Sequence, residues 1–327
     1  MRRQITEDDR DFASSVVAAA FTITITCLSL LGNITVIVVA RTDSELKLHV
    51  SNLLIVNLAV TDLLTSLLVM IPSITTLIYD RWILGTALCK LHCTLNYCFI
   101  IVSMLSLSLI TIDRAVAVKH PLRYAQIMTT CRIGFMIGYA WLQGLAFALI
   151  PSVYNWVHFD YWEAVCAIKW EVNLPIIAYV VIAFLCCFII PAGIIVFYNT
   201  TILWSAQKMK HNTILPKLLQ TKTAKGSERI RGASGSNDRC QSVGLARQKI
   251  ARSIIVIIFV FLLCMTPFCL IKLLKVLLGA EAIPTWANLF STIIQFTASA
   301  TNPFIYAIFR RDFRYALKRL PRRLFGL

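Results

Sequence analysis

The chain has 327 residues, of which 58% are hydrophobic and only 15% are charged, and its formal net charge is +16. An ordinary soluble domain carries about 25% charged residues, so this composition excludes a typical soluble protein. The positive charge does not call for a nucleic acid partner, because most of it gathers in two segments. Eleven lysine and arginine residues lie in 205–252 and seven lie in the tail 310–327.

Stretches with almost no formal charge recur seven times, and each is long enough to cross a membrane. A helix needs about 20 apolar residues for the hydrocarbon layer, where the backbone must satisfy its own hydrogen bonds. We therefore predict an all-α membrane protein that folds as a bundle of seven transmembrane helices. The predicted spans are residues 14–40, 50–79, 86–118, 130–152, 173–208, 245–278 and 284–308. Core helices of a soluble domain are disfavoured, because soluble helices show a polar stripe.

Basic residues are spread unevenly over the segments between these spans. With seven crossings, the segment 205–252 and the tail 310–327 fall on one side, together with the loops 41–49 and 119–132. An excess of Lys and Arg marks the cytoplasmic side. We therefore predict a multi-pass protein of the plasma membrane, with residues 1–13 extracellular and the C-terminus cytosolic.

The C-terminal tail predicts one further helix. Apolar residues recur on one of its faces and basic residues cover the other, a pattern typical of a helix that lies on the membrane surface. The apolar positions are Phe313, Ala316, Leu317 and Leu320. We therefore predict a short, cytosolic amphipathic helix and tail over 310–327, in contact with membrane lipids.

The eleven cysteines are scattered, and none of their spacings is typical of a zinc site. Nine lie in predicted spans or on the predicted cytosolic side, where we expect reduced thiols that fill apolar space. Cys89 and Cys166 lie at the predicted extracellular mouth, where oxidation is permitted. We predict that these two cysteines form a disulfide.

Short motifs follow one another in a defined order along the spans. They are Gly32-Asn33, Asn57-Leu58-Ala59-Val60-Thr61-Asp62, Trp82, Cys89, Asp113-Arg114, Pro121-Leu122, Trp141, Pro191, Cys264-Met265-Thr266-Pro267 and Asn302-Pro303-Phe304-Ile305-Tyr306. On these motifs the chain resembles a rhodopsin-like (class A) G-protein-coupled receptor over nearly its whole length. The resemblance implies a heterotrimeric G protein as partner, an extracellular ligand, a receptor domain over 14–309 with a cytosolic loop at about 209–244, and no enzymatic activity.

Asp62 is the one acid within the second predicted span. An ionised carboxylate at mid-membrane costs about 2.5–3.5 kcal/mol on insertion scales, so we expect it to have partners and a role. The resemblance implies that Asn33, Ser103 and Asn302 surround Asp62 and that a sodium ion, the one cofactor we consider, binds there. Ala298 departs from this pattern, since the family often has Asn at that position. The alternative is an Asp satisfied by hydrogen bonds alone, which would join helices without a metal.

The resemblance assigns coupling to charged residues at the inner ends of the third and sixth spans. Asp113 and Arg114 close the third span, and the guanidinium of Arg114 has five donors that can cap the carbonyls of an inserted partner helix. Arg247 and Lys249 stand at the inner start of the sixth span. Because Arg247 replaces an acid of the family, we expect a weaker inactive-state latch and raised basal signalling. An ordinary interfacial charge pair is the simpler alternative for the third span.

Prolines in the last two spans predict where the bundle bends. Pro267 removes a backbone hydrogen bond, so the inner half of the sixth span can swing outward. The activation switch that the resemblance implies consists of Phe261, Met265, Pro267, Asn302, Pro303 and Tyr306. Met265 replaces the usual Trp and is flexible. We therefore expect a weak link from the ligand pocket to the bend.

The ligand site is the least specific part of the sequence. Asn96 stands where an amine receptor has an acid, and Phe296 stands where a retinal-binding receptor has a Lys. The resemblance therefore disfavours both kinds of ligand and favours an orphan-type member. We assign four residues to the ligand pocket: Asn96, Phe268, Lys272 and Thr292.

Two outer features leave alternatives open. Lys272 and Lys275 suit an acidic or phosphate-bearing ligand, or they snorkel to the outer interface. The loop at 152–171 is rich in aromatic residues and is tethered by Cys166. It folds into the mouth as a lid or built-in agonist, or its aromatics anchor it among the headgroups.

Two other functional classes compete with a receptor. A transporter or channel would use Asp62 as an intramembrane ion site, but it would also want charged residues along a path and two related halves, and we detect no internal repeat. A membrane enzyme would need clustered His and Asp residues, whereas the five histidines are dispersed. The sequence favours a receptor that signals through an outward swing of the sixth span.

Overall fold

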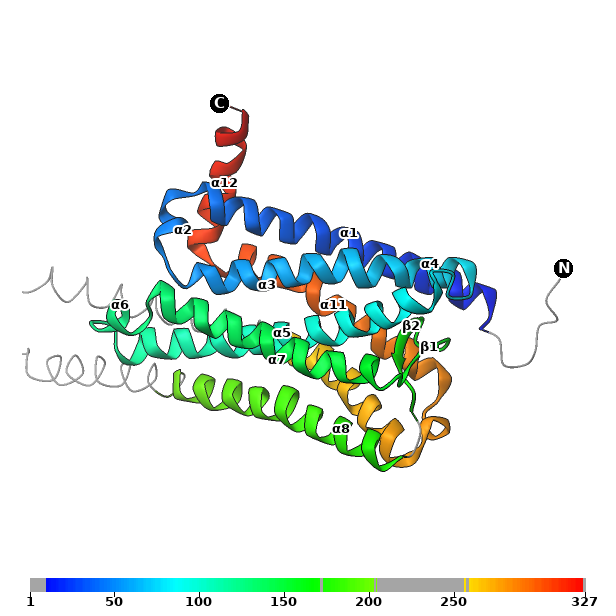
Figure 1. Ribbon diagram of the computed structural model, residues 1–327. Coiled ribbons are helices and arrows are strands. Elements are labelled where there is room, and N and C mark those ends of the chain that lie inside the picture. The colour runs from blue at the N-terminus through cyan, green and yellow to red at the C-terminus, as the bar shows by residue number, and fades with distance from the viewer. Residues whose placement is uncertain (1–9, 171–172, 203, 205–255, 257–258, 326–327) are drawn as a thin grey trace, which may run out of the picture.

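The computed structural model describes residues 10–170, 173–202, 204, 256 and 259–325. Its helices form an elongated bundle (Figure 1). The first four spans contain α1 (Phe12–Thr42), α3 (Asn52–Thr65) with α4 (Ile71–Tyr79), α5 (Gly85–Lys119) and α7 (Thr130–Val153). The fifth span is Leu174–Ile202, which begins with α8 (Leu174–Phe184), and the described part of the sixth span is Phe259–Leu278. The remaining helices are α2 (Ser44–Leu48), α6 (Tyr124–Ile127), α11 (Thr285–Phe309) and α12 (Arg311–Phe325).

Six of these helical spans are long and apolar enough to cross a membrane, counted over the described residues. The seventh span, α11, is less apolar because its buried side carries polar groups. These are Asn288, Ser291, Thr292, Gln295, Ser299 and Asn302. α11 nevertheless packs along α1 and also contacts α3 inside the bundle. The predicted all-α seven-helix membrane bundle is confirmed.

Two spans contain a π-helical turn next to a proline. The turn Ser66–Met70 precedes Pro72 in the second span, and the turn Leu185–Ile189 precedes Pro191 in the fifth. Proline cannot donate the backbone hydrogen bond of an α-helix, and a π-turn absorbs this local mismatch. Both spans therefore continue through their prolines.

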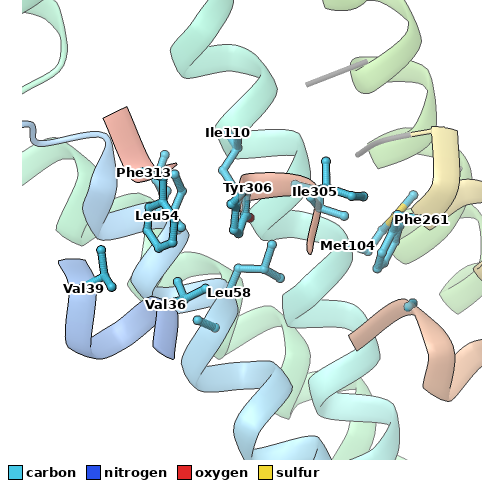
Figure 2. Close-up of a cluster of buried hydrophobic side chains, with 14 of the residues drawn as sticks. Val36, Val39, Leu54, Leu58, Met104, Ile110, Phe261, Ile305, Tyr306 and Phe313 are labelled. Carbon is cyan, nitrogen blue, oxygen red and sulfur yellow. The ribbon is translucent and has the colours of Figure 1, made fainter. Parts of the chain in front are cut away.

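The hydrophobic core of the inner half joins residues of all seven spans with α2 and α12 (Figure 2). Val36 of α1, Leu58 of α3, Ile110 of α5 and Tyr306 of α11 are buried there. Phe313 of α12 lies with its ring centroid 6.1 Å from that of Tyr306, which docks the C-terminal helix against the bundle. The amphipathic pattern of the tail therefore has a second use, since part of its apolar face packs on protein.

Gly32 permits a close approach between α1 and α11. A Cβ atom at this position would lie 2.8 Å from Cγ of Pro303, closer than real Cβ atoms come to a neighbour. The Gly32-Asn33 and Asn302-Pro303 motifs are therefore in contact in the fold, although 268 residues lie between them in the sequence.

The outer loop folds as a hairpin, which the sequence did not predict. β1 (Val157–Asp160) pairs antiparallel with β2 (Val165–Ile168), with Val157 opposite Ile168 and Asp160 opposite Val165. Ala164 in the turn has a positive φ of 54°. The hairpin lies at one end of the bundle, whereas α2, α6 and α12 lie at the other (Figure 1).

Several expectations fall on residues outside this description. Arg247, Lys249 and the whole loop at 209–244 lie outside the described residues, as does most of 1–13. Within the description, α1 begins at Phe12 and α12 covers Arg311–Phe325.

Candidate functional site

The disulfide predicted at the mouth of the bundle is confirmed. Cys89 and Cys166 are bonded, with sulfur atoms 2.08 Å apart and Cα atoms 5.4 Å apart. The bond joins the first turns of α5 to the buried strand β2. It therefore holds the hairpin against the third span.

The two lysines of the sixth span are buried beneath the hairpin, where we find that they meet loop acids. Lys272 is 6% exposed, Lys275 2% and Glu163 0%. Glu163 forms ion pairs with both lysines, and Nζ of Lys275 also lies 3.1 Å from Oδ2 of Asp160. We call Lys272 and Lys275 the dilysine site. Because both ammonium groups are buried and paired, they do not snorkel to the interface.

Asp160 of the hairpin is held in its ionised form by this arrangement. Burial of Asp160 opposes its ionisation, but the charges of Lys275 and Lys272 and a hydrogen bond from Lys275 outweigh burial, so the pKa of Asp160 is lowered. The backbone N–H of Glu163 donates to Oδ1 of Asp160 at 3.1 Å, which fixes the turn. The hydroxyl of Thr76 in α4 donates to the carbonyl of Ala164 at 3.0 Å and anchors the turn to the second span.

A cavity of about 100 Å³ lies between the third, fifth and sixth spans under the hairpin. Of the four residues we assigned to a ligand pocket, Phe268 and Lys272 line it, whereas Asn96 and Thr292 are buried outside its lining. The other lining residues are Tyr97, Ile100, Ile101, Met104, Ile168, Trp170, Tyr179, Val180, Ala183, Phe184, Cys187, Phe188, Met265 and Cys269. Trp170 belongs to the aromatic loop, which was the one sequence signal for it.

The acid in the second span is buried and has hydrogen-bond donors. Asp62 is 1% exposed, and Nδ2 of Asn302 donates to its Oδ2 at 2.8 Å. Ser299 supplies a second side-chain hydrogen bond to Asp62, a contact that the sequence did not predict. Nδ2 of Asn33 instead donates to the carbonyl of Ser299 at 3.0 Å. Ser103 is buried, and among the described residues no hydrogen bond joins it to Asp62.

The donor set around Asp62 fits a hard monovalent cation. Oδ1 of Asn302 and Oδ1 of Asn33 are buried and have no hydrogen-bond partner among the described residues. Together with the carboxylate and with the hydroxyls of Ser29 and Ser66, which bond to each other at 2.7 Å, they form an all-oxygen environment. Carboxylate, amide and hydroxyl oxygens are the ligands that hard cations prefer.

A second pair of motif residues meets between the second and fourth spans. Nε1 of Trp141 donates to Oδ1 of Asn57 at 2.9 Å, and Nδ2 of Asn57 donates to Oγ of Ser106 at 2.8 Å. These contacts give the motif residues Asn57 and Trp141 a structural role in helix packing. They fix the packing of three helices.

The charged pair at the inner end of the third span has two partners that the sequence did not indicate. Nε of Arg114 lies 3.4 Å from Oδ2 of Asp113, an ion pair without hydrogen-bond geometry. The hydroxyl of Tyr124 donates to Oδ1 of Asp113 at 2.7 Å, and Arg114 donates to Oγ of Ser51 at 3.1 Å. Burial and the hydrogen bond to Asp113 raise the pKa of Tyr124 to about 12. Arg114 is thus held by weak contacts to the second and third spans.

The residues of the expected activation switch lie along one buried path. Met265 lines the cavity, and Phe261 packs in the inner core beside Met104 (Figure 2). Asn302 contacts Asp62, and Tyr306 is buried in the same core as Phe261. Pro267 lies in the sixth span between Met265 and Phe268, which both line the cavity.

The fold and sequence were compared with known proteins. Residues 32–306 match the model of a family described as 7 transmembrane receptor (rhodopsin family). The chain is 28% identical to the octopamine receptor beta-1R of Drosophila melanogaster, over 91% of this chain and 60% of that protein. It is 27% identical to 5-hydroxytryptamine receptor 4 of Homo sapiens, over 92% of this chain and 78% of that protein. The crystal structure of squid rhodopsin matches with a TM-score of 0.82 at 22% identity, over 98% of this chain and 89% of that chain.

These matches distinguish the receptor from the alternative of a transporter or channel. The family match covers most of the chain and contains every motif from Gly32 to Tyr306. It favours the receptor and gives no support to a transporter or channel at Asp62. The likeness to squid rhodopsin shows a common fold.

Proposed function

Because the chain belongs to the rhodopsin family of seven-transmembrane receptors, we propose that it transduces an extracellular signal, or its own basal activity, to a heterotrimeric G protein. The observation that supports this proposal best is the position of Arg114. Its guanidinium lies at the inner end of the bundle, where it is ion-paired with Asp113 and donates a hydrogen bond to Ser51. Its contacts are weak enough to be exchanged for those of a partner.

The signalling step is a two-state equilibrium of the bundle. In one state the inner half of the sixth span closes over Arg114. In the other it swings outward about Pro267, and Arg114 caps carbonyl groups of the inserted G-protein helix. Arg247 and Lys249 would contribute positive charge beside the cytosolic groove that this outward swing opens. The receptor then promotes nucleotide exchange on its partner and performs no covalent chemistry.

Two observations support an orientation with the hairpin end outside the cell and the C-terminus in the cytosol. The Cys89–Cys166 disulfide needs an oxidising compartment, which supports an extracellular position of the hairpin end. The basic tail then faces the cytosol, as Lys and Arg excess favours. Epitope tags at the two termini of the chain in intact cells test this: the N-terminal tag should be accessible and the C-terminal tag should not.

A sodium ion fits the oxygens around Asp62. Asp62, Asn302 and Asn33 would hold it, with hydroxyls of Ser29 and Ser66 nearby. A bound cation would neutralise the buried carboxylate and so favour the packed state of the bundle. The Asp62→Asn variant removes this charge, and its melting temperature should no longer rise when sodium chloride replaces choline chloride.

The ligand is not assigned by the relatives. Octopamine and 5-hydroxytryptamine are named in two of them, but this chain has Asn96 where an amine receptor has an acid. An external ligand would enter the apolar cavity under the hairpin, beside Phe268 and Lys272. The cavity presents few polar groups, so its shape and its apolar contacts with the ligand would dominate recognition.

The coupling proposal is tested by Arg114→Ala in cells that report each class of G protein. The wild-type chain should give ligand-free output above that of vector, and Arg114→Ala should reduce it to background at equal surface expression. Arg81→Ala, an exposed arginine at the opposite end, is the matched control and should keep full output. Output that is unchanged in Arg114→Ala refutes the proposal.

A further inference from the structure

Four charged groups meet at the outer end of the bundle, and the chain supplies all of them: Lys272, Lys275 and Glu163 are buried, and Asp160 is partly buried. Asp160 and Glu163 come from the hairpin, and Lys272 and Lys275 come from the sixth span, more than 100 residues away. Burying a charge is strongly unfavourable unless an opposite charge meets it. The two lysines bring two positive charges and the two hairpin acids bring two negative charges. These charges therefore cancel only while the hairpin acids lie next to the lysines.

The dilysine site lies where the ligand cavity meets the hairpin. Lys272 lines the cavity, and its Nζ lies 4.7 Å from the ring centroid of Phe268 and 5.1 Å from that of Trp170. Aromatic faces attract a cation without neutralising its charge. The carboxylate of Glu163 therefore takes the position, next to the cavity, that an acidic group of a free ligand would take.

The hairpin delivers this carboxylate at a fixed position. Cys166, three residues after Glu163, is bonded to the third span, and Thr76 holds the carbonyl of Ala164. A group tethered in this way acts at a high effective concentration and excludes a free competitor.

We propose that the dilysine site is a carboxylate-binding site and that Glu163 is its resident, covalently tethered ligand. This inference rests on the proposed signalling function and deepens it, since it names what occupies the outer site of the receptor. The same ion pairs link the sixth span, through the hairpin and the Cys89–Cys166 bond, to the third span.

Through its ion pairs, Glu163 holds the outer end of the sixth span, which moves as a rigid helix about the bend at Pro267. Lys272 and Lys275 lie on the outer side of the pivot, and Phe261 lies on the inner side. A pull on the outer end toward the hairpin moves the inner end the opposite way, out of the bundle. Glu163 therefore stabilises the signalling state and sustains output without an external ligand.

Removing the side chain should convert the tethered site into a site for a free acid. In Glu163→Ala the ammonium groups of Lys272 and Lys275 lose their main partner, and the lost side chain leaves space next to the cavity. The probe is propionate, a small carboxylate with a short apolar chain. Propionamide has the same shape without the charge.

The binding experiment uses the full chain purified in lipid nanodiscs. Sodium propionate should raise the melting temperature of Glu163→Ala, relative to sodium chloride at the same ionic strength. Propionamide should not raise it, and propionate should not raise that of the wild type, whose site is filled. Adding Lys272→Ala to Glu163→Ala should remove the effect. A shift of equal size in wild type and variant, or no shift in Glu163→Ala, overturns the proposal.

The signalling experiment measures ligand-free output in cells. At equal surface expression, Glu163→Ala should lower output at least about fivefold, the lower end of coupling between sites, and propionate should restore part of it. Glu281→Ala, an exposed acid at the same end, is the control and should match wild type. Wild-type output from Glu163→Ala overturns the tethered-ligand role.

Two further measurements keep the outcomes distinct. If Glu163→Ala does not reach the cell surface, Glu163→Gln retains the volume without the charge and should show the same loss of output with no rescue. Unchanged output in Glu163→Gln then overturns the proposal. If the wild type itself gives no more output than Arg114→Ala, the proposed function fails, while the nanodisc experiment still decides whether the dilysine site binds a carboxylate.

Discussion

The two ends of the bundle are restrained in different ways. At the outer end a disulfide and buried ion pairs join the third span, the hairpin and the sixth span, which lie far apart in the sequence. At the inner end the described contacts of Arg114 are an ion pair with its neighbour Asp113 and one hydrogen bond to Ser51. The outer end is thus fixed by the chain itself, whereas the inner end can open at small cost.

Breaking the disulfide should have the largest effect on this difference. Removing a native disulfide costs about 2–5 kcal/mol in small domains, and here Cys166→Ala also releases the hairpin that carries Glu163. We expect a clear fall in melting temperature and in ligand-free output. Cys27→Ala, a free and exposed cysteine, is the control. If Cys166→Ala keeps the melting temperature and the output of wild type, the outer end is not held as described.

Weakening the inner end should act in the opposite direction. Tyr124→Phe removes a hydrogen bond to Asp113, worth about 1 kcal/mol, and so loosens the pair that restrains Arg114. Ligand-free output should rise a few-fold while the melting temperature changes little. Tyr139→Phe, which lies exposed on α7, should leave output unchanged. A fall in output after Tyr124→Phe would contradict the role given to this contact.

A smaller effect should follow from stiffening the path between the two ends. Met265 lines the cavity and is buried near Phe261, so Met265→Trp should fill cavity space and restore the side chain usual in the family. We expect ligand-free output to fall, measured as cAMP or the second messenger of the coupled G protein. Met265→Leu, which keeps the volume, should stay close to wild type. No fall in Met265→Trp at equal surface expression would remove this account of the position.

The sequence predicted those features that depend on local composition. The spans could be located because each contains almost no charged residues. This held even for α11, which has a polar face but no charged residues. The disulfide could be predicted because only Cys89 and Cys166 fall at the outer mouth.

Contacts between distant segments could not be predicted where neither the compartment of the cysteines nor the resemblance pointed to them. Nothing near Glu163 in the sequence indicates that it meets Lys272 and Lys275, because that contact exists only after the hairpin folds over the bundle. The bonds of Ser299 to Asp62 and of Tyr124 to Asp113 have the same origin. Asn96 was considered for the pocket because of the resemblance, yet neither Asn96 nor Thr292 lines the cavity, because the facing direction of each helix decides that lining.

The central claim is that the chain activates a G protein through the inner end of its bundle. The most direct measurement is the rate of guanine-nucleotide exchange on purified heterotrimers of each class, with the chain in nanodiscs and no added ligand. We predict that wild type accelerates exchange on at least one class and that Arg114→Ala does not. Equal rates with wild type, with Arg114→Ala and with empty nanodiscs, across all classes, would contradict the account.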